Sequence, residues 1–209
     1  MFLKACGITR PEDARAARQA GFDAIGLVFA PSPRRLNPEQ ARGLSLACPP
    51  GLLKVGVFVD EDRREVERLA RYCLLDLLQF HGNEDPSYVA GFGKRAIRAL
   101  AVPPDFSPVA LDEYRGCFAV LLDSRGASHP EGPGRPPHWA AAALASLRHR
   151  VILAGGLTPT LAGRAALRVR PFGLDVSSGV EREPGVKDHA MLTAFARAAR
   201  SARPVTEVV

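Results

Sequence analysis

A lysine and a cysteine two residues apart could carry out acid–base chemistry near the start of the sequence. Lys4 and Cys6 lie in the short apolar run FLKAC, just before a glycine. Alternate side chains of a β-strand face the same way, so both would point to one side. A nearby ammonium favours the thiolate, the form in which a cysteine acts as a base. We therefore expect Lys4 to lower the thiol pKa of Cys6 and to pair with a carboxylate, either Asp175 or Asp123.

The other cysteines show no pattern that indicates chemistry. Cys48, Cys73 and Cys117 are scattered, with no CxxC motif and no Cys/His cluster. The sequence therefore predicts neither a zinc site nor a disulfide framework. Each of the three is interpreted as a small, partly apolar core residue.

Eight short apolar runs must position these residues, and they alternate with helical segments. The intervening stretches EDARAARQAG, REVERLARY and PTLAGRAALRV carry apolar residues at i, i+3 and i+4 spacing. Such alternation with short connections predicts parallel strands, and eight units favour a closed (β/α)8 barrel forming one domain over residues 1–209. The fifth unit, residues 96–114, has the least regular pattern because its helix follows a proline-rich loop. The eight runs are FLKAC, DAIGLVF, LKVGVFV, LLQF, AIRAL, FAVLLD, VILA and FGLDVSS.

Polar residues follow the ends of these runs, where the active site of such a barrel lies. Glycines and serines after the last two runs suit the phosphate position of this fold, where backbone N–H groups bind an anion. The sequence thus predicts a phosphorylated substrate. Taken singly, Lys4, Asp123 and His81 could each have a structural role, but their common location favours an active site. The set comprises Cys6, Arg34, Arg35, Gln79, His81, Asp123, Gly155, Gly156, Asp175, Ser177, Ser178 and Gly179.

Composition argues against two other classes of partner. The formal net charge is +6, but stretches such as RPEDARAAR interleave acids with arginines, and no basic stripe with aromatic residues occurs. We therefore expect no nucleic-acid partner. No apolar stretch reaches the roughly 20 residues of a membrane helix, and no signal-peptide pattern is present. We expect a soluble cytoplasmic protein without a membrane partner.

Seven segments, in order, resemble one enzyme family over nearly the whole chain. They are KACGIT, DAIGLVFAPSPR, VGVFV, LLQFHG, LLDS, ILAGGLTP and DVSSGVEREPGVKD. The sequence resembles phosphoribosylanthranilate isomerase, the isomerase of tryptophan biosynthesis. The resemblance implies a (β/α)8 barrel that converts N-(5-phosphoribosyl)anthranilate to 1-(2-carboxyphenylamino)-1-deoxyribulose 5-phosphate by an Amadori rearrangement. It also implies that no cofactor and no metal is needed.

The resemblance also implies residue roles. Cys6 corresponds to the general base and Asp123 to the general acid, so their surroundings must push their pKa values apart. Arg35 aligns best with the arginine that binds the anthranilate carboxylate, although the adjacent Arg34 remains an alternative. Two supporting sets complete the site: His81 and Asp175 line the substrate pocket, and Gly155, Gly156, Ser178 and Gly179 bind the phosphate.

One loop departs from the family pattern. The family's glycine-glycine-threonine-glycine loop and the Phe-Asp-Trp that follows it correspond here to EGPGRPPHW. Glu131 replaces a glycine, Pro133 replaces the threonine, and His138 replaces the aspartate. Proline has no backbone N–H, and glutamate cannot adopt the positive φ open to glycine. We expect altered kinetics and retained function.

Other interpretations stay open at this point. Another sugar-phosphate isomerase or epimerase would share the glycine and serine elements with a different acid–base pair. A metal-dependent epimerase would need several ligands at strand ends, where His81 is the one histidine. A ligand-binding barrel would bind phosphate without turnover. The sequence leaves monomer and homodimer equally open.

Overall fold

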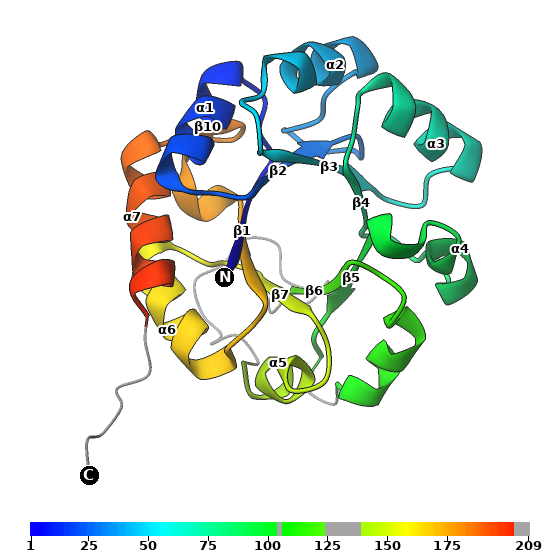
Figure 1. Ribbon diagram of the computed structural model, residues 1–209, viewed down its shortest axis with the longest axis vertical. Helices are drawn as coiled ribbons and strands as arrows, with labels where there is room; N and C mark the ends of the chain where they lie inside the picture. The colour runs from blue at the N-terminus through cyan, green and yellow to red at the C-terminus, as the bar shows by residue number, and fades with distance from the viewer. Residues whose placement is uncertain (104–105, 124–138, 203–209) are drawn as a thin grey trace.

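The computed structural model describes residues 1–103, 106–123 and 139–202. Eight strands, β1 to β8, form one closed parallel barrel in chain order, in which β8 pairs with β1 (Figure 1). Each of the eight expected apolar runs coincides with one strand to within a few residues at its ends, and the predicted (β/α)8 fold is confirmed. The strands are β1 (Phe2–Cys6), β2 (Ala24–Val28), β3 (Leu53–Phe58), β4 (Leu77–Phe80), β5 (Ala96–Ala101), β6 (Ala119–Asp123), β7 (Val151–Ala154) and β8 (Gly173–Val176).

Helices form an outer ring around the strands (Figure 1). Several begin with proline in the first turn, where its missing N–H costs nothing. Asn37 and Gln40 form a capping box at α2, and aspartates cap α3, α4 and α7. The α-helices are α1 (Pro11–Ala20), α2 (Pro38–Ala47), α3 (Arg63–Tyr72), α4 (Pro86–Ala90), α5 (Trp139–Ser146), α6 (Pro159–Val169) and α7 (His189–Ser201).

The fifth unit differs from the expected strand–helix pattern. Between β5 and β6 the chain forms a 3-10 helix, η2 (Pro108–Tyr114), in place of an α-helix. Pro108 at its start and Gly116 just beyond its end leave a segment too short for a stable α-helix. Two further 3-10 turns are η1 (Gly93–Arg95) and η3 (Ser178–Val180).

The sequence pattern does not predict a short hairpin that follows β8. Its strands, β9 (Glu181–Glu183) and β10 (Val186–Lys187), are antiparallel. Thr9 Oγ1, in the loop after β1, donates to the carbonyl oxygen of Gly185 at 2.6 Å. The hairpin is thereby attached to the end of the first strand.

Apolar side chains fill both the barrel and the space between strands and helices. The interior includes Phe2, Val55, Ile97, Leu121 and Ile152. A larger cluster packs the helices against the outside of the strands. Within the described part of the chain, no helix is both long and apolar enough to cross a membrane.

Candidate active site

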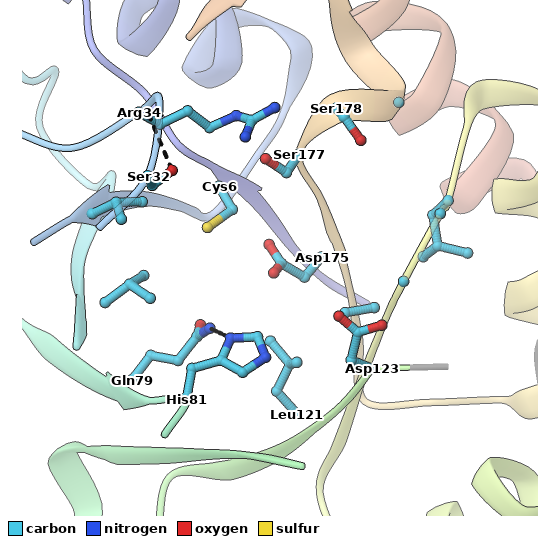
Figure 2. Close-up of a pocket in the computed structure, with 17 residues that line it drawn as sticks. Cys6, Ser32, Arg34, Gln79, His81, Leu121, Asp123, Asp175, Ser177 and Ser178 are labelled. Atoms are coloured by element: carbon cyan, nitrogen blue, oxygen red, sulfur yellow. Dashed lines mark hydrogen bonds between the residues drawn. The ribbon is translucent and has the colours of Figure 1, made fainter. Parts of the chain in front are cut away.

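A pocket opens at the carboxyl ends of the strands, where the sequence places its candidate residues. Figure 2 shows Cys6, Asp175 and Asp123 facing it from three strands, with His81 on the opposite wall. All but one of the predicted site residues line this pocket: Cys6, His81, Asp123, Gly155, Gly156, Asp175, Ser178 and Gly179. Arg35 is the exception.

The two adjacent arginines point in different directions. Arg34 lines the pocket, whereas Arg35 is exposed and is not among the lining residues. The backbone of Arg35 forms a bridge with Val28 at the end of β2. Arg34 lies in the turn just before this bridge. The structure therefore brings Arg34 to the pocket lining, and the role of Arg35 in binding the anthranilate carboxylate stays a prediction.

The buried Lys4 forms an ion pair with Asp175. Its Nζ lies 3.0 and 3.1 Å from the two carboxylate oxygens, and the two residues are paired in the β1–β8 register. Of the two carboxylates expected as partners, the structure selects Asp175. Burial lowers the pKa of Lys4, but the charges of Asp175 and Cys6 outweigh it, so the pKa is raised. Lys4 therefore remains a cation inside the barrel.

The thiol of Cys6 has a higher pKa than the sequence suggests. Burial raises its pKa, and this effect outweighs the lowering by Lys4 and Lys187. Lys4 therefore lowers the thiol pKa as expected, but burial has the larger effect. The thiol also packs tightly against β2, because a Cβ at Gly26 would lie 2.7 Å from Sγ. Cys6 is thus held at a fixed place beside the pocket.

His81 is kept neutral by its surroundings. Burial lowers its pKa, and its Nδ1 lies 3.3 Å from Nε2 of Gln79 (Figure 2). When the Gln79 amide donates to Nδ1, the ring proton sits on Nε2. His81 can then donate one hydrogen bond into the pocket without bringing a positive charge.

The loops after β7 and β8 meet at the predicted anion position. Gly155 and Gly156 adopt φ values of 93° and 64°, which favour glycine. A Cβ at Gly179 would lie 1.8 Å from the carbonyl oxygen of Leu157, so the close contact between the loops requires glycine there. Backbone N–H groups of the two loops therefore border one corner of the pocket.

Sequence reasoning missed two charged residues of the hairpin, Glu181 and Lys187. Glu181 accepts two hydrogen bonds from Arg34, and Lys187 Nζ donates to Glu181 Oε1 at 2.6 Å. Both lie in the quoted motif DVSSGVEREPGVKD, but exposed charges surround them in the sequence. Nothing in that pattern separates the two buried charges from surface ones.

The parts of the site define a class of protein. A thiol and a carboxylate can move protons, a neutral imidazole can donate a hydrogen bond, and glycine-rich loops can hold an anion. Among the described residues, no group of three His, Cys, Asp or Glu side chains could hold a metal ion. The molecule is a (β/α)8 barrel with acid–base side chains and glycine-rich loops at the carboxyl ends of its strands.

The chain belongs to the N-(5'-phosphoribosyl)anthranilate isomerase family, whose model matches residues 3–198. The isomerase of Pseudomonas putida (strain GB-1) is 45% identical over 201 residues, which cover 95% of this chain and 97% of that protein. That of Pelobacter propionicus is 43% identical over 202 residues, which cover 96% of each.

Solved structures agree with this assignment. The phosphoribosyl anthranilate isomerase of Thermotoga maritima has a TM-score of 0.88 at 37% identity, covering 96% of this chain and 99% of that one. A structure of the isomerase in complex with reduced 1-(o-carboxyphenylamino)-1-deoxyribulose 5-phosphate has a TM-score of 0.85 at 36% identity, with the same coverage. The expected family is thereby confirmed.

Proposed function

We propose that Cys6 and Asp123 are the acid–base pair of an enzyme that converts N-(5-phosphoribosyl)anthranilate to 1-(2-carboxyphenylamino)-1-deoxyribulose 5-phosphate. The chain is an isomerase of tryptophan biosynthesis. The observation that supports these residue roles is that both side chains line the same pocket, which the two glycine-rich loops also line.

The first step opens the sugar ring. Asp123, in its protonated form, gives its proton to the furanose ring oxygen as the bond between that oxygen and C1 breaks. The nitrogen lone pair of the substrate forms a double bond to C1, which gives a protonated Schiff base. Asp123 is left as a carboxylate. The position of Asp123 at the end of β6, facing the pocket, suits this role (Figure 2).

The second step moves the hydrogen of C2. The Cys6 thiolate takes the proton from C2, and the released electron pair forms the C1–C2 double bond while the C1–N double bond becomes single. The resulting enolamine tautomerises to the ketone: the C2 hydroxyl loses its proton, the C2–O bond becomes double, and the electron pair of the C1–C2 double bond takes a proton at C1. Because the thiol pKa is raised, a smaller fraction of the thiol is ionised, but the thiolate that forms is a stronger base.

Other residues of the pocket bind the substrate. An arginine of the loop after β2 would bind the anthranilate carboxylate, either Arg35, as the family resemblance implies, or the adjacent Arg34, which lines the pocket, because a guanidinium can bind a carboxylate through two parallel hydrogen bonds. His81 and Asp175 lie where the open sugar chain would pass between the two ends. The phosphate would bind the loops that contain Gly155, Gly156, Ser178 and Gly179.

Turnover by active-site variants tests these roles. The purified protein is mixed with freshly generated phosphoribosylanthranilate, and the anthranilate-type fluorescence is followed. We expect Cys6→Ser and Asp123→Asn each to lower kcat by about 10²- to 10⁴-fold, the usual contribution of general acid–base groups. Cys48→Ser, which changes a half-buried cysteine outside the pocket, is the matched control and keeps wild-type kcat. Near-normal kcat in either active-site variant contradicts the role of that residue.

Three broader features belong to the same proposal. The chain forms a single domain, since relatives match it over nearly its whole length. It acts in the cytoplasm, as suits a biosynthetic enzyme with a phosphorylated substrate. It is a monomer or a homodimer; the Thermotoga maritima relative is described as a dimeric protein from which monomers were generated.

A further inference from the structure

We propose that Arg98 is a positioning residue, which keeps His81 in place in the substrate pocket by holding the backbone on both sides of it. The inference rests on the proposed function, because it takes His81 as a residue that contacts the open sugar chain. Arg98 itself is not among the residues that line the pocket. Its effect on the reaction must therefore pass through the histidine.

The strand register brings Arg98 beside the loop that carries His81. In the pairing of β4 with β5, Arg98 lies opposite Phe80, the last residue of β4 and the one just before His81. The neighbouring residues Ile97 and Ala99 belong to the barrel interior. Since side chains alternate along a strand, Arg98 points outward, into the layer between the strands and the helices. There, 6% of its side chain is exposed.

The guanidinium of Arg98 holds the chain on each side of His81. Its Nη1 donates to the carbonyl oxygen of Phe80 at 3.2 Å, and its Nη2 donates to the carbonyl oxygen of Gly82 at 3.0 Å. The donors of a planar guanidinium have a fixed geometry, so the two carbonyl groups are held relative to each other. The backbone N–H of His81 itself donates to the carbonyl oxygen of Phe58, at the end of β3, at 2.9 Å. The backbone before and after the histidine is thus fixed.

Glu84 pairs with the buried cation and extends the network to a second loop. Its Oε2 accepts from Arg98 Nη1 at 2.6 Å and from the backbone N–H of Gly82 at 2.9 Å. Its Oε1 accepts from the backbone N–H of Asp60, in the loop after β3, at 3.0 Å. The side chain of Glu84 is 3% exposed. One buried ion pair therefore connects the loops after β3 and β4.

The imidazole of His81 depends on this loop for its position. The ring faces the pocket and leaves part of its surface open to solvent (Figure 2). Next to it the loop has no spare room, because a Cβ at Gly82 would lie 2.4 Å from Oδ1 of Asp60. The same oxygen accepts from the backbone N–H of Asn83 at 2.5 Å. A change in the path of the loop would therefore move the ring within the pocket.

The cost of burying charge indicates that the pair of Arg98 and Glu84 does more than fill space. Replacing a buried ion pair with apolar side chains of similar volume is often neutral or stabilising. Stability alone therefore does not explain a charged pair in an otherwise apolar layer. Apolar side chains could not donate hydrogen bonds to the two loop carbonyl groups, and the arginine does so on both sides of a pocket residue.

The test compares two arginines of the same segment in steady-state kinetics. Arg98→Met should lower kcat/KM for phosphoribosylanthranilate about 10- to 100-fold, because a displacement of about 1 Å at a reacting site can cost this much. The loss should fall mainly on kcat, since the open sugar chain forms only after the substrate has bound. Unchanged kcat in Arg98→Met would overturn the inference.

Arg95→Met is the matched control. Arg95 also donates to two backbone carbonyl oxygens, those of Asp76 and Leu75, but it lies just before β5, at the end of the strand away from the pocket. This variant should leave both constants unchanged. An equal loss of kcat in the two variants would overturn the inference, because it would show a general effect of removing such an arginine.

A double-mutant cycle separates positioning from a purely structural role. If Arg98 acts through His81, then Arg98→Met lowers kcat in the wild-type background but not in a His81→Ala background. An equal decrease in both backgrounds would overturn the inference. Should Arg98→Met fail to fold, Glu84→Gln replaces it in the cycle, because it keeps the shape of the side chain but removes the charge that holds Arg98.

Failure of the proposed function would look different. Wild-type protein without turnover would contradict the activity itself. Turnover with an unchanged kcat in His81→Ala would contradict the role of His81 in the pocket. Wild-type turnover with lowered kcat in His81→Ala and normal kcat in Arg98→Met would contradict the positioning role of Arg98 alone.

Discussion

The thiol of Cys6 lies among charges of both signs. Lys4 and Lys187 favour its thiolate, whereas burial and Asp175 favour the neutral thiol, and burial is the largest effect. The carbonyl oxygen of the same residue accepts a hydrogen bond from Lys187. One residue thus provides the proposed base through its side chain and an attachment point for the β9–β10 hairpin through its backbone.

The raised thiol pKa predicts the pH dependence of catalysis. The proposed base must be ionised, so kcat/KM should rise with pH, and its acid limb should lie above the ordinary thiol pKa of about 8.5. The measurement is a pH profile of kcat/KM, compared with the pH dependence of Cys6 alkylation by iodoacetamide. A limb near pH 6 that matches the alkylation profile would show that the surroundings favour the thiolate instead.

Residue identity was easier to predict from the sequence than residue environment. Cys6 and Asp123 end apolar runs, and strand alternation alone brings such residues to the pocket. That Arg34 and not Arg35 lines the pocket depends on the path of one loop, which no periodic pattern reveals. The direction of the Cys6 pKa shift depends on how much burial outweighs two cations, and that balance exists only in the folded molecule.

At the scale of elements, the two loops after β7 and β8 depend on each other. The η3 turn brings Gly179 against the backbone at Leu157, so the anion corner forms only when both loops have their native paths. The hairpin that follows was not predictable, because strands of three and two residues are too short to show an alternating pattern.

Gly179→Ala should damage the anion corner. The added Cβ would meet the carbonyl oxygen of Leu157 at 1.8 Å, so one loop must shift and the KM for the phosphorylated substrate should rise at least tenfold. The control is Gly43→Ala, in the interior of α2, where a Cβ meets nothing within 4 Å. That change should raise stability by about 0.5–1 kcal/mol and leave KM unaltered. An unchanged KM in Gly179→Ala would exclude this corner as the phosphate site.

At the scale of the whole molecule, one buried ion pair connects the first strand to the last. Lys4 and Asp175 are 171 residues apart in the sequence and form their bond where β8 closes the barrel onto β1. Removing one partner of a buried ion pair leaves the other charge buried without a partner. The resulting loss of stability is larger than the stability that the intact pair contributes.

Lys4→Met should therefore destabilise the barrel by about 3–5 kcal/mol. Lys54→Met is the matched control, because the ion pair of Lys54 with Asp76 is partly exposed and should contribute about 0–1 kcal/mol. Urea unfolding of the two variants and the wild type gives the comparison. Equal midpoints and equal free energies of unfolding in the two variants would show that the buried pair adds nothing to barrel closure.

The distance along the chain between Lys4 and Asp175 also matters while the protein is being made. An N-terminal strand that leaves the ribosome carries its cation long before the matching carboxylate has been translated. Until then, Lys4 cannot enter an apolar interior without a high desolvation cost, so β1 stays hydrated. The strand that bears the proposed base must therefore wait until β8 has been translated, and the nascent chain has no finished active site before then.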